Sequence, residues 1–166
     1  MTLETSGVDR PRQLTAEHLA ARVLIDASTF AEAAPRILEA ICTNFGWEHG
    51  GFWVVNAVTE TVRCAEIWTA PGARFADFGA ASRTLTFTRG IGLPGRVWQS
   101  AEPAWIPDVT KDANFPRAAV ALREGLHAAF GFPVLLCGEV LGVMEFFSRE
   151  IQEPDEELLT LLTTVG

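Results

Sequence analysis

The chain has 166 residues, of which 48% are hydrophobic and 20% are charged, and its formal net charge is −8. This is the length of one domain, and the apolar content suffices for a core and excludes wholesale disorder. The acidic balance argues against a nucleic-acid partner, which requires a basic face. No apolar run reaches the ~18 residues that a membrane span needs, so no membrane segment is expected.

The N-terminal stretch and the cysteines both favour a cytoplasmic protein. Residues 1–14 are polar, lack a hydrophobic signal core and are expected to form a flexible leader. Cys42, Cys64 and Cys137 lie far apart without metal-binding spacing, which predicts buried thiols in a reducing compartment. Residues 15–166 are expected to form a single domain.

Two amphipathic helices are predicted at the start of this domain. Residues 15–28 carry an apolar stripe at helical spacing. In the second helix, which Thr29 begins as part of a capping box, apolar residues repeat over 30–45. Pro35 predicts either a kink or a slightly later start, and Gly46 predicts the C-terminal stop.

The apolar pattern then changes to that of β-strands. Residues 50–57 and 61–70 are β-rich runs around a short polar turn, which predicts an antiparallel hairpin. A second hairpin is predicted within 127–148, where two apolar runs meet at Cys137-Gly138-Glu139. Shorter elements are predicted between the hairpins: a loop with at least one helical turn at 71–83, a strand at 84–88, a helix at 93–100, an extended piece at 103–107 and a helix at 117–125.

A last helix is predicted over 153–166, because Pro154 and a cluster of acids suit a helix N-terminus. Its apolar stripe of Leu158, Leu161, Leu162 and Val165 stops in mid-pattern, so we expect a longer natural helix that is truncated here. The whole order predicts an α+β fold. Helices at both ends would pack on one face of an antiparallel sheet, and short elements would cover the other.

Residues 90–95, GIGLPG, fit the G-x-G-x-x-G pattern of dinucleotide-binding loops, and Asp108 follows at a suitable distance. The neighbouring elements do not fit, because the preceding strand is short and the following helix is cut at Gln99-Ser100. Pro94 also removes an amide that a phosphate would need. The glycines are therefore interpreted as conformational, since they permit tight turns between the sheet edge and a cap over its face.

Three blocks carry a family resemblance: GIGLPGRVWQSAEPAWIPDV (90–109), NFPRAAVALREGLHAAFGFPV (114–134) and GEVLGVMEFFS (138–148). Together they resemble the GAF domain, most closely the GAF modules of bacterial multi-domain sensor histidine kinases, over roughly residues 17–166. The resemblance implies a GAF/PAS-like sheet of five to six antiparallel strands with a small-ligand pocket beneath short roofing helices. It also implies a sensory, non-catalytic module beside other sensor and kinase domains.

The residues favour none of the cofactors or reactions known for such domains, and the cofactor is left open. The nearest match to a cyclic-nucleotide signature, residues 111–115, has the wrong order. A covalent bilin needs a cysteine near the roof, and residues 100–136 contain none. Haem would depend on His127, which is more simply a strand-edge histidine. The glycine loop has no thiol for methionine sulfoxide reduction, and the histidines show no metal-binding spacing.

Ten residues are candidates for lining a pocket. Glu145 alternates with Leu141, Val143 and Phe147 and so shares an apolar strand face, where its carboxylate must be paired or face a wet pocket. The plainer interpretation is a strand-edge ion pair with one of Arg83, Arg89, Arg96 and Arg117; Asp108 would be a turn cap, and the aromatic residues would be core. The candidates are Trp68, Phe87, Trp98, Trp105, Asp108, Phe115, Arg117, His127, Phe130 and Glu145.

Two functions follow from these observations. The first is a sensory module that binds a small molecule between sheet and roof and passes a shift to its terminal helices. The alternative is a purely structural dimerisation module with no ligand, whose terminal helices form a bundle with a second copy. In both cases we expect a homodimer through the terminal helices and no chemistry within the chain.

Overall fold

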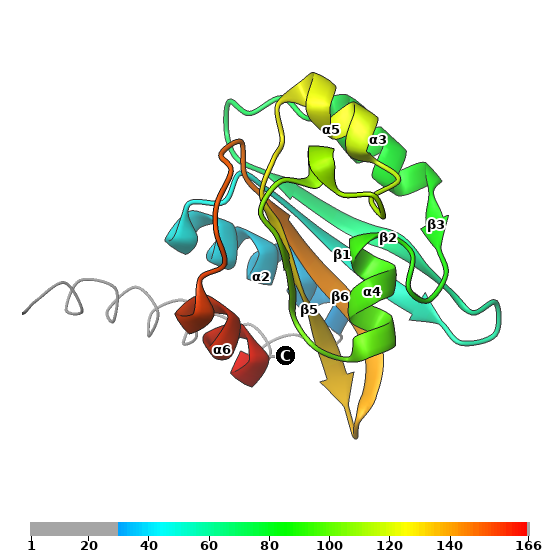
Figure 1. Ribbon diagram of the computed structural model, residues 1–166. Helices are drawn as coiled ribbons and strands as arrows, with labels where there is room; N and C mark the ends of the chain where they lie inside the picture. The colour runs from blue at the N-terminus through cyan, green and yellow to red at the C-terminus, as the bar shows by residue number, and fades with distance from the viewer. Residues whose placement is uncertain (1–29, 166) are drawn as a thin grey trace, which may run out of the picture.

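The structure, a computed structural model, describes residues 30–165 (Figure 1). The predicted leader (1–14), the first predicted helix (15–28) and the Thr29 cap lie outside these residues.

A six-stranded antiparallel sheet forms the centre of the described chain. Its strands lie in the order β3-β2-β1-β6-β5-β4, and every neighbouring pair is antiparallel. The strands are β1 (His49–Asn56), β2 (Thr61–Thr69), β3 (Thr86–Phe87), β4 (Ala104–Ile106), β5 (Ala129–Leu136) and β6 (Glu139–Phe147). Both predicted hairpins are confirmed as the β1–β2 and β5–β6 pairs, and β1 and β6 meet in the middle of the sheet.

Helices cover the two faces of the sheet in different ways (Figure 1). The two long helices, α2 (Phe30–Phe45) and α6 (Glu156–Val165), pack on one face, here called the helix face. The short elements α3 (Ala76–Thr84), α4 (Gly92–Ser100), the 3-10 turn η1 (Val109–Lys111) and α5 (Ala118–Glu124) cover the other face and form the roof. The predicted α+β architecture is thus confirmed.

The buried side chains form two clusters, one on each face of the sheet. The helix-face cluster joins Ile37 and Leu38 of α2 to Phe146 of β6 and Leu158 of α6. The roof cluster lies between the sheet and the short helices and includes Val97 and Phe147. Adjacent residues of a strand point to opposite faces, so β6 supplies apolar side chains to both clusters.

Helix α2 follows the apolar repeat seen in the sequence, and Ile37, Leu38 and Ile41 are almost fully buried. Pro35 lies inside the helix, so the helix does not begin later than its predicted cap. Gly46 ends it with a left-handed φ of 75°, and its N–H donates to the Cys42 carbonyl at 2.9 Å. This is the glycine stop that the sequence predicts.

The segment expected to hold at least one helical turn contains most of α3, a helix of 9 residues, so this expectation is confirmed. One strand is shorter than expected. The strand predicted over 84–88 is reduced to Thr86 and Phe87, because only Val62 and Arg63 of β2 pair with it.

The β5–β6 hairpin turns through two residues in the left-handed region, Cys137 with φ 51° and Gly138 with φ 80°. Two consecutive left-handed residues match the right-handed twist of the paired strands. The turn and a register shift between Val134 and Leu135 together set the β5–β6 pairing, which decides the face on which each β6 side chain lies.

The glycine loop has the conformational role that its sequence indicates. Gly90 and Gly92 adopt φ values of 82° and 68°, and the Gly90 N–H donates to the Gly95 carbonyl at 2.9 Å. Asn114 bridges the loop: it accepts from the Gly92 N–H at 3.1 Å and donates to the Gly90 carbonyl at 2.8 Å. Since every described strand pair is antiparallel, the parallel βαβ unit of a dinucleotide fold does not form around this loop.

Gly95 is the position in this loop least able to accept a side chain. A Cβ there would lie 2.3 Å from the Thr88 carbonyl oxygen, a backbone atom that cannot rotate away. We expect Gly95→Ala to lower the free energy of unfolding by about 2 kcal/mol or more, in the range of overpacked cores. Chemical denaturation measures this difference.

Gly79→Ala is the matched control, because a Cβ at this helical position meets only Ile67 Cδ1, at an ordinary 3.7 Å. Alanine is favoured over glycine inside a helix by roughly 0.5–1 kcal/mol, so this variant should be neutral or slightly more stable. Equal losses in the two variants would show that Gly95 is not specially constrained.

Candidate functional site

A buried ion pair between Arg117 and Glu145 lies at the centre of the roofed interior. Glu145 is on β6, a middle strand, and faces the roof together with Val143 and Phe147. Arg117 is the N-cap residue of α5. Its two terminal nitrogens donate to the two carboxylate oxygens at 2.7 and 2.8 Å, and the side chains are 0% and 2% exposed. This two-pronged geometry is the strongest arrangement for the pair.

Residues of other elements complete the polar contacts of this pair. Trp53 of β1 donates its indole N–H to Glu145 Oε1 at 2.7 Å. Ser82 of α3 accepts from Arg117 Nη1 at 3.0 Å and donates to the Phe78 carbonyl at 2.9 Å. The network therefore joins two central strands to two roof helices. Among the described residues, Arg117 Nε is the one buried side-chain polar atom without a hydrogen-bond partner.

Aromatic rings surround the Arg117 guanidinium. Five ring centroids lie 4.9 to 5.5 Å from its central carbon, those of Trp53, Phe78, Phe87, Phe115 and Phe147. Rings at this distance attract a cation through their electron-rich faces and exclude water. An aromatic cage closed by a carboxylate is a binding site for an organic cation, and here the cation belongs to the chain itself.

Glycines on both neighbouring strands flank Glu145 in the sheet. The register places Gly51 of β1 and Gly131 of β5 opposite it. A Cβ at Gly51 would lie 3.4 Å from Glu145 Oε1, and a Cβ at Gly131 would lie 3.4 Å from Leu93 and Val97 of α4. The missing side chains thus leave room for the carboxylate and for close approach of the roof.

His49 lies at the edge of this network, at the start of β1. Its Nδ1 lies 3.1 Å from Thr69 Oγ1, and its ring meets Phe75 and Phe78 edge-on. Burial, with the Arg117 charge as a second cause, lowers the pKa of His49 from 6.5 to about 3. The unfolded chain binds this proton first as the pH falls, so His49 contributes stability that is lost below pH 6.5.

The structure brings together only part of the candidate set. Phe87 and Phe115 belong to the aromatic cage around Arg117 and Glu145, and Trp98 lies elsewhere in the roof cluster. The remaining aromatic candidates, Trp68, Trp105 and Phe130, belong to the opposite, helix-face cluster. These three rings therefore do not lie beneath the roof, and they pack in the core as the plainer interpretation of the aromatic residues expects.

Asp108 and His127 form a separate pair beside η1. Asp108 Oδ1 lies 3.0 Å from His127 Nδ1 and accepts from the N–H and the hydroxyl of Thr110, at 3.1 and 2.7 Å. The turn-cap interpretation of Asp108 is confirmed. His127 binds an acid, and its main-chain N–H donates to the Ser148 carbonyl at 2.8 Å.

The prediction of an ion pair between Glu145 and an arginine is confirmed, but the predicted position of the pair is wrong. Arg117 is among the partners expected for Glu145, yet the pair lies on a middle strand rather than at a strand edge. Sequence reasoning missed Trp53 and Ser82. The alternation of side chains along β1 is the signal that points to Trp53. Trp53 lies two residues after Gly51, which is opposite Glu145, so the two residues share a face of the sheet.

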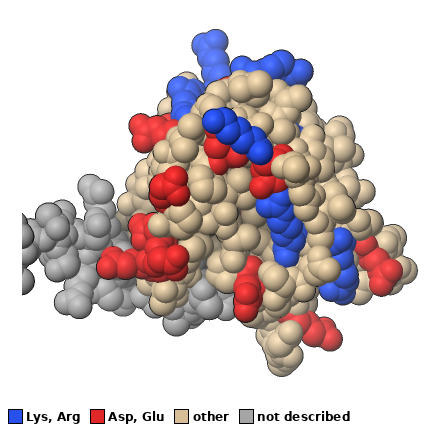
Figure 2. All heavy atoms as spheres, viewed as in Figure 1, with Lys and Arg blue, Asp and Glu red and all other residues tan. Residues whose placement is uncertain are grey.

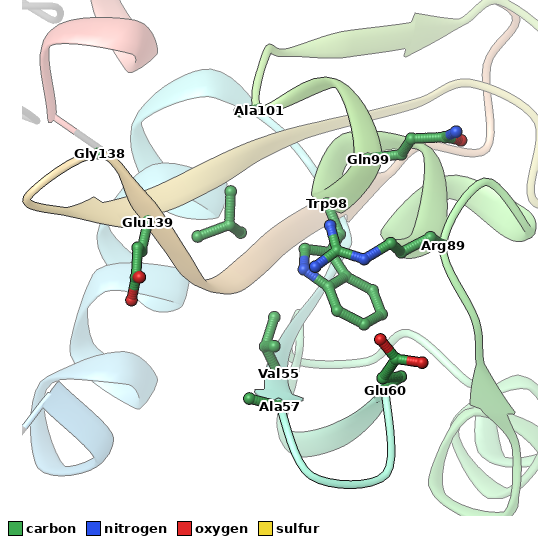
Figure 3. Close-up of a pocket in the computed structure, with 10 residues that line it drawn as sticks. Val55, Ala57, Glu60, Arg89, Trp98, Gln99, Ala101, Gly138 and Glu139 are labelled. Atoms are coloured by element: carbon green, nitrogen blue, oxygen red, sulfur yellow. The ribbon is translucent and has the colours of Figure 1, made fainter.

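Among the hollows that the described residues form, two open outside this interior, and neither is lined by Arg117 or Glu145. One of about 610 Å³ lies between β2 and α3 and includes Ile67 and Phe75. The other, of about 380 Å³, lies at the end of the sheet near Trp98 and is shown in Figure 3. On the face viewed in Figure 2, acidic and basic side chains are interspersed rather than gathered into one basic field.

Cys42 and Cys64 are buried, whereas Cys137 is exposed in the β5–β6 turn, so the prediction of buried thiols is wrong for Cys137. Burial raises the pKa of Cys42 far above its usual value. Burial and the Glu145 charge raise the pKa of Cys64 to about 12. Within residues 30–165, no three His, Cys, Asp or Glu side chains are grouped to hold a metal ion. None of the helices in that same range has the length and apolarity to cross a membrane.

The family model of the GAF domain matches residues 27–166. This chain belongs to the GAF family. GAF domains are in general regulatory or sensory modules of signalling proteins, although some proteins of this fold are enzymes. No curated protein matches the chain.

Solved GAF structures share the fold at low sequence identity. The A. aeolicus nlh2 GAF domain in an inactive state is 22% identical with a TM-score of 0.71, and the match covers 95% of this chain and 90% of that one. The GAF domain of a phosphoenolpyruvate-protein phosphotransferase from Coxiella burnetii is 17% identical, with a TM-score of 0.76 and coverage of 93% and 88%. The free methionine-R-sulfoxide reductase of Neisseria meningitidis, solved with its substrate, is 16% identical, with a TM-score of 0.74 and coverage of 99% and 89%.

Removing one partner of the buried pair should strongly destabilise the domain. We expect Arg117→Ala to lower the free energy of unfolding by about 3–5 kcal/mol, because it leaves the Glu145 carboxylate buried and unpaired. Arg96→Ala is the control: Arg96 pairs with Asp112, but these side chains are 26% and 21% exposed. Its expected loss is about 1 kcal/mol, measured by the same denaturant titration.

The double variant Arg117→Met/Glu145→Leu distinguishes the contribution of the ion pair to stability from the contribution of side-chain packing. Apolar replacements of a buried pair are often neutral or stabilising, so this variant should recover most of the stability lost by Arg117→Ala. A double variant no more stable than Arg117→Ala would contradict this account of the interior.

Proposed function

We propose that this GAF domain is a non-catalytic regulatory module of a signal-transduction protein, such as the sensor histidine kinases that its sequence resembles. It relays a signal through its terminal helices and takes no ligand beneath its roof. The observation that carries the proposal is the Arg117 side chain, which occupies the roofed interior in a closed contact with Glu145.

An outside ligand would have to displace Arg117 to enter this space. Displacement separates a buried pair, leaves Glu145 unpaired and disturbs the Trp53 and Ser82 hydrogen bonds. Breaking such a pair costs about 3–5 kcal/mol, which the ligand's own contacts would have to exceed. The closed pair therefore favours relay between domains over detection of a small molecule in the interior.

The sheet supplies a short physical route from this pair to the terminal helices. Glu145 faces the roof, whereas its neighbour Phe146 faces the helix face and packs in the cluster shared by α2 and Leu158 of α6. A displacement of the side chains on one face can therefore shift those on the other face through the single strand β6. Relay requires that the signal favours one arrangement of these helices over another.

The thiol chemistry supports a role without catalysis. The methionine sulfoxide reductase of the same fold is an enzyme, but residues 88–100, around the glycine loop of this chain, contain no cysteine. The raised pKa of Cys64 keeps its thiol protonated in the neutral range, whereas the nucleophile in such chemistry is the thiolate.

The second candidate function is a purely structural dimerisation module. The same closed interior favours it, because a domain that only holds two chains together needs no ligand. Hydrogen exchange separates the two candidates. Relay predicts that the double variant Arg117→Met/Glu145→Leu, which is expected to keep most of its stability, changes exchange in α2 and α6 as well as in the roof, whereas a passive module predicts changes confined to the roof.

The proposed dimer makes a prediction about α6. The terminal helices are expected to pair with those of a second copy, and the apolar stripe of α6 includes the half-buried Leu161. We expect Leu161→Glu to weaken self-association by at least about tenfold, or 1.4 kcal/mol, because it places a charge in an apolar helical seam. Sedimentation velocity over a range of protein concentrations measures the change.

Thr160→Glu is the matched control, since Thr160 is exposed on the same helix, and its self-association should be unchanged. A wild-type chain that stays monomeric at every concentration would contradict relay through a dimer. A rise in melting temperature with a cyclic nucleotide or haem would instead support an interior ligand, because only native-state binding raises it.

A further inference from the structure

The outer edge of β2 is paired over only part of its length. Along all of β2 the inner edge pairs with β1, whereas β3 pairs only with Val62 and Arg63 on the outer edge. The chain leaves the position of β3 at Leu85, whose N–H donates to the Ala81 carbonyl at 3.1 Å and ends α3. Among the described strands, none therefore pairs with the outer edge of β2 over residues 64–69.

The register shows which main-chain groups of this edge point outward. The Ala70 N–H donates to the Glu48 carbonyl at 2.9 Å, so Ala70 directs its hydrogen bond toward β1. Successive residues of an antiparallel strand direct their N–H and C=O groups alternately to the two sides. Thr69 and Ile67 therefore direct theirs outward, and no described main-chain group bonds to them there. Such an edge can pair with another strand.

The hollow of about 610 Å³ lies between this part of β2 and α3, and is here called the edge groove. Figure 1 shows α3 alongside β2, with β3 beyond the end of the helix. One face of α3 lines the groove with three small residues and an arginine, namely Ala76, Gly79, Ala80 and Arg83. Ile67 and Phe75 add larger apolar surface. The small residues of α3 leave room for side chains of a partner.

Each end of the edge groove carries an arginine, and no described acid lines it. Arg83 is in the last turn of α3, next to β3. Arg74 precedes Phe75 at the other end, where the His49 ring lies between Phe75 and Thr69. Neither Arg74 nor Arg83 forms an ion pair with a described residue. In a chain of net charge −8, this local positive charge favours an acidic partner.

We propose that the edge groove binds an extended acidic peptide of another protein, which adds a strand to β2. The main chain of the peptide bonds to the outward N–H and C=O groups of Ile67 and Thr69, as in other cases of strand addition. Its alternate apolar side chains lie against Ile67 and the small residues of α3, and an acidic residue at each end meets Arg74 or Arg83. This docking site goes beyond the relay function proposed above and does not require the interior to open.

The charges and main-chain groups of the edge groove disfavour other occupants. A second copy paired through the same edge would bring Arg74 and Arg83 of both chains together, and like charges that meet at an interface oppose binding. A basic peptide would meet the same repulsion. A small apolar ligand would leave the outward main-chain groups of β2 without partners.

The test uses the whole chain labelled with nitrogen-15 and the peptide acetyl-Glu-Val-Thr-Val-Thr-Val-Glu-amide. The matched peptide carries lysine in place of both glutamates. We expect the acidic peptide to cause saturable shifts of the Ile67 and Thr69 amide resonances and to slow hydrogen exchange of both amides. The lysine peptide should bind at least about tenfold more weakly.

Two variants test the groove itself. Arg74→Glu/Arg83→Glu should weaken binding of the acidic peptide by at least about tenfold. Ala80→Trp places an indole in the groove from an exposed position and should prevent binding. The matched control is Arg36→Glu/Arg123→Glu, because both arginines are exposed and lie outside the groove. It should bind like the wild type in 0.15 M salt, which screens distant charges, and melting curves verify that each variant is folded.

The proposal is overturned if the acidic peptide gives no saturable shift, if the lysine peptide binds equally well, or if binding leaves exchange of the Ile67 and Thr69 amides unchanged. Shifts of these amides that grow with protein concentration without peptide would also overturn it, in favour of a second copy. Leu161→Glu, which is expected to weaken the dimer, should bind the peptide like the wild type, so the two proposals fail separately.

Discussion

The buried contact between Arg117 and Glu145 is the constraint on which the arrangement of the roof depends. A carboxylate on the central strand of a sheet, facing a water-free interior, is tolerated only when a positive charge meets it with good geometry. Arg117 supplies that charge from the start of α5, Ser82 of α3 braces the guanidinium, and Trp53 braces the carboxylate. Gly51 and Gly131 leave the space. Separating the roof from the sheet would therefore leave the Glu145 carboxylate and the Arg117 guanidinium without their partners.

This constraint changes how the GAF fold is used in this chain. The fold places a roofed space on one side of the sheet and the terminal helices on the other. Here the roofed space is an aromatic cage with a carboxylate, already occupied by the chain's own cation. The ion pair then ties the roof to the sheet. Regulation by contacts between domains and by the packing of α2 and α6 fits such an interior.

Much of the fold could be predicted from local patterns, because hydrophobic period and turn residues are local properties. The β5–β6 hairpin with its turn at Cys137-Gly138 and the stop of α2 at Gly46 are of this kind. The position of Glu145 on the apolar face of β6 also follows from alternation. The face of the sheet on which each aromatic residue lies could not be predicted, because it depends on the register between strands. Phe130 pairs with Phe146 and Trp105 pairs with Phe130, so both rings lie on the face opposite to Glu145. The contacts of Trp53 and Ser82 depend on elements 92 and 35 residues away from their partners, and no local pattern indicates them.

The most direct test of the central claim is chemical rescue of Arg117→Ala with methylguanidinium. If the interior is a site built for a guanidinium, millimolar methylguanidinium should raise the melting temperature of this variant, since a ligand that binds only the native state stabilises it. The same concentration should leave the wild type and Arg96→Ala unchanged, and methylammonium should rescue less, because it cannot form the two-pronged contact with Glu145. Equal responses of all three proteins, or none in Arg117→Ala, would contradict the claim that Arg117 occupies a guanidinium site.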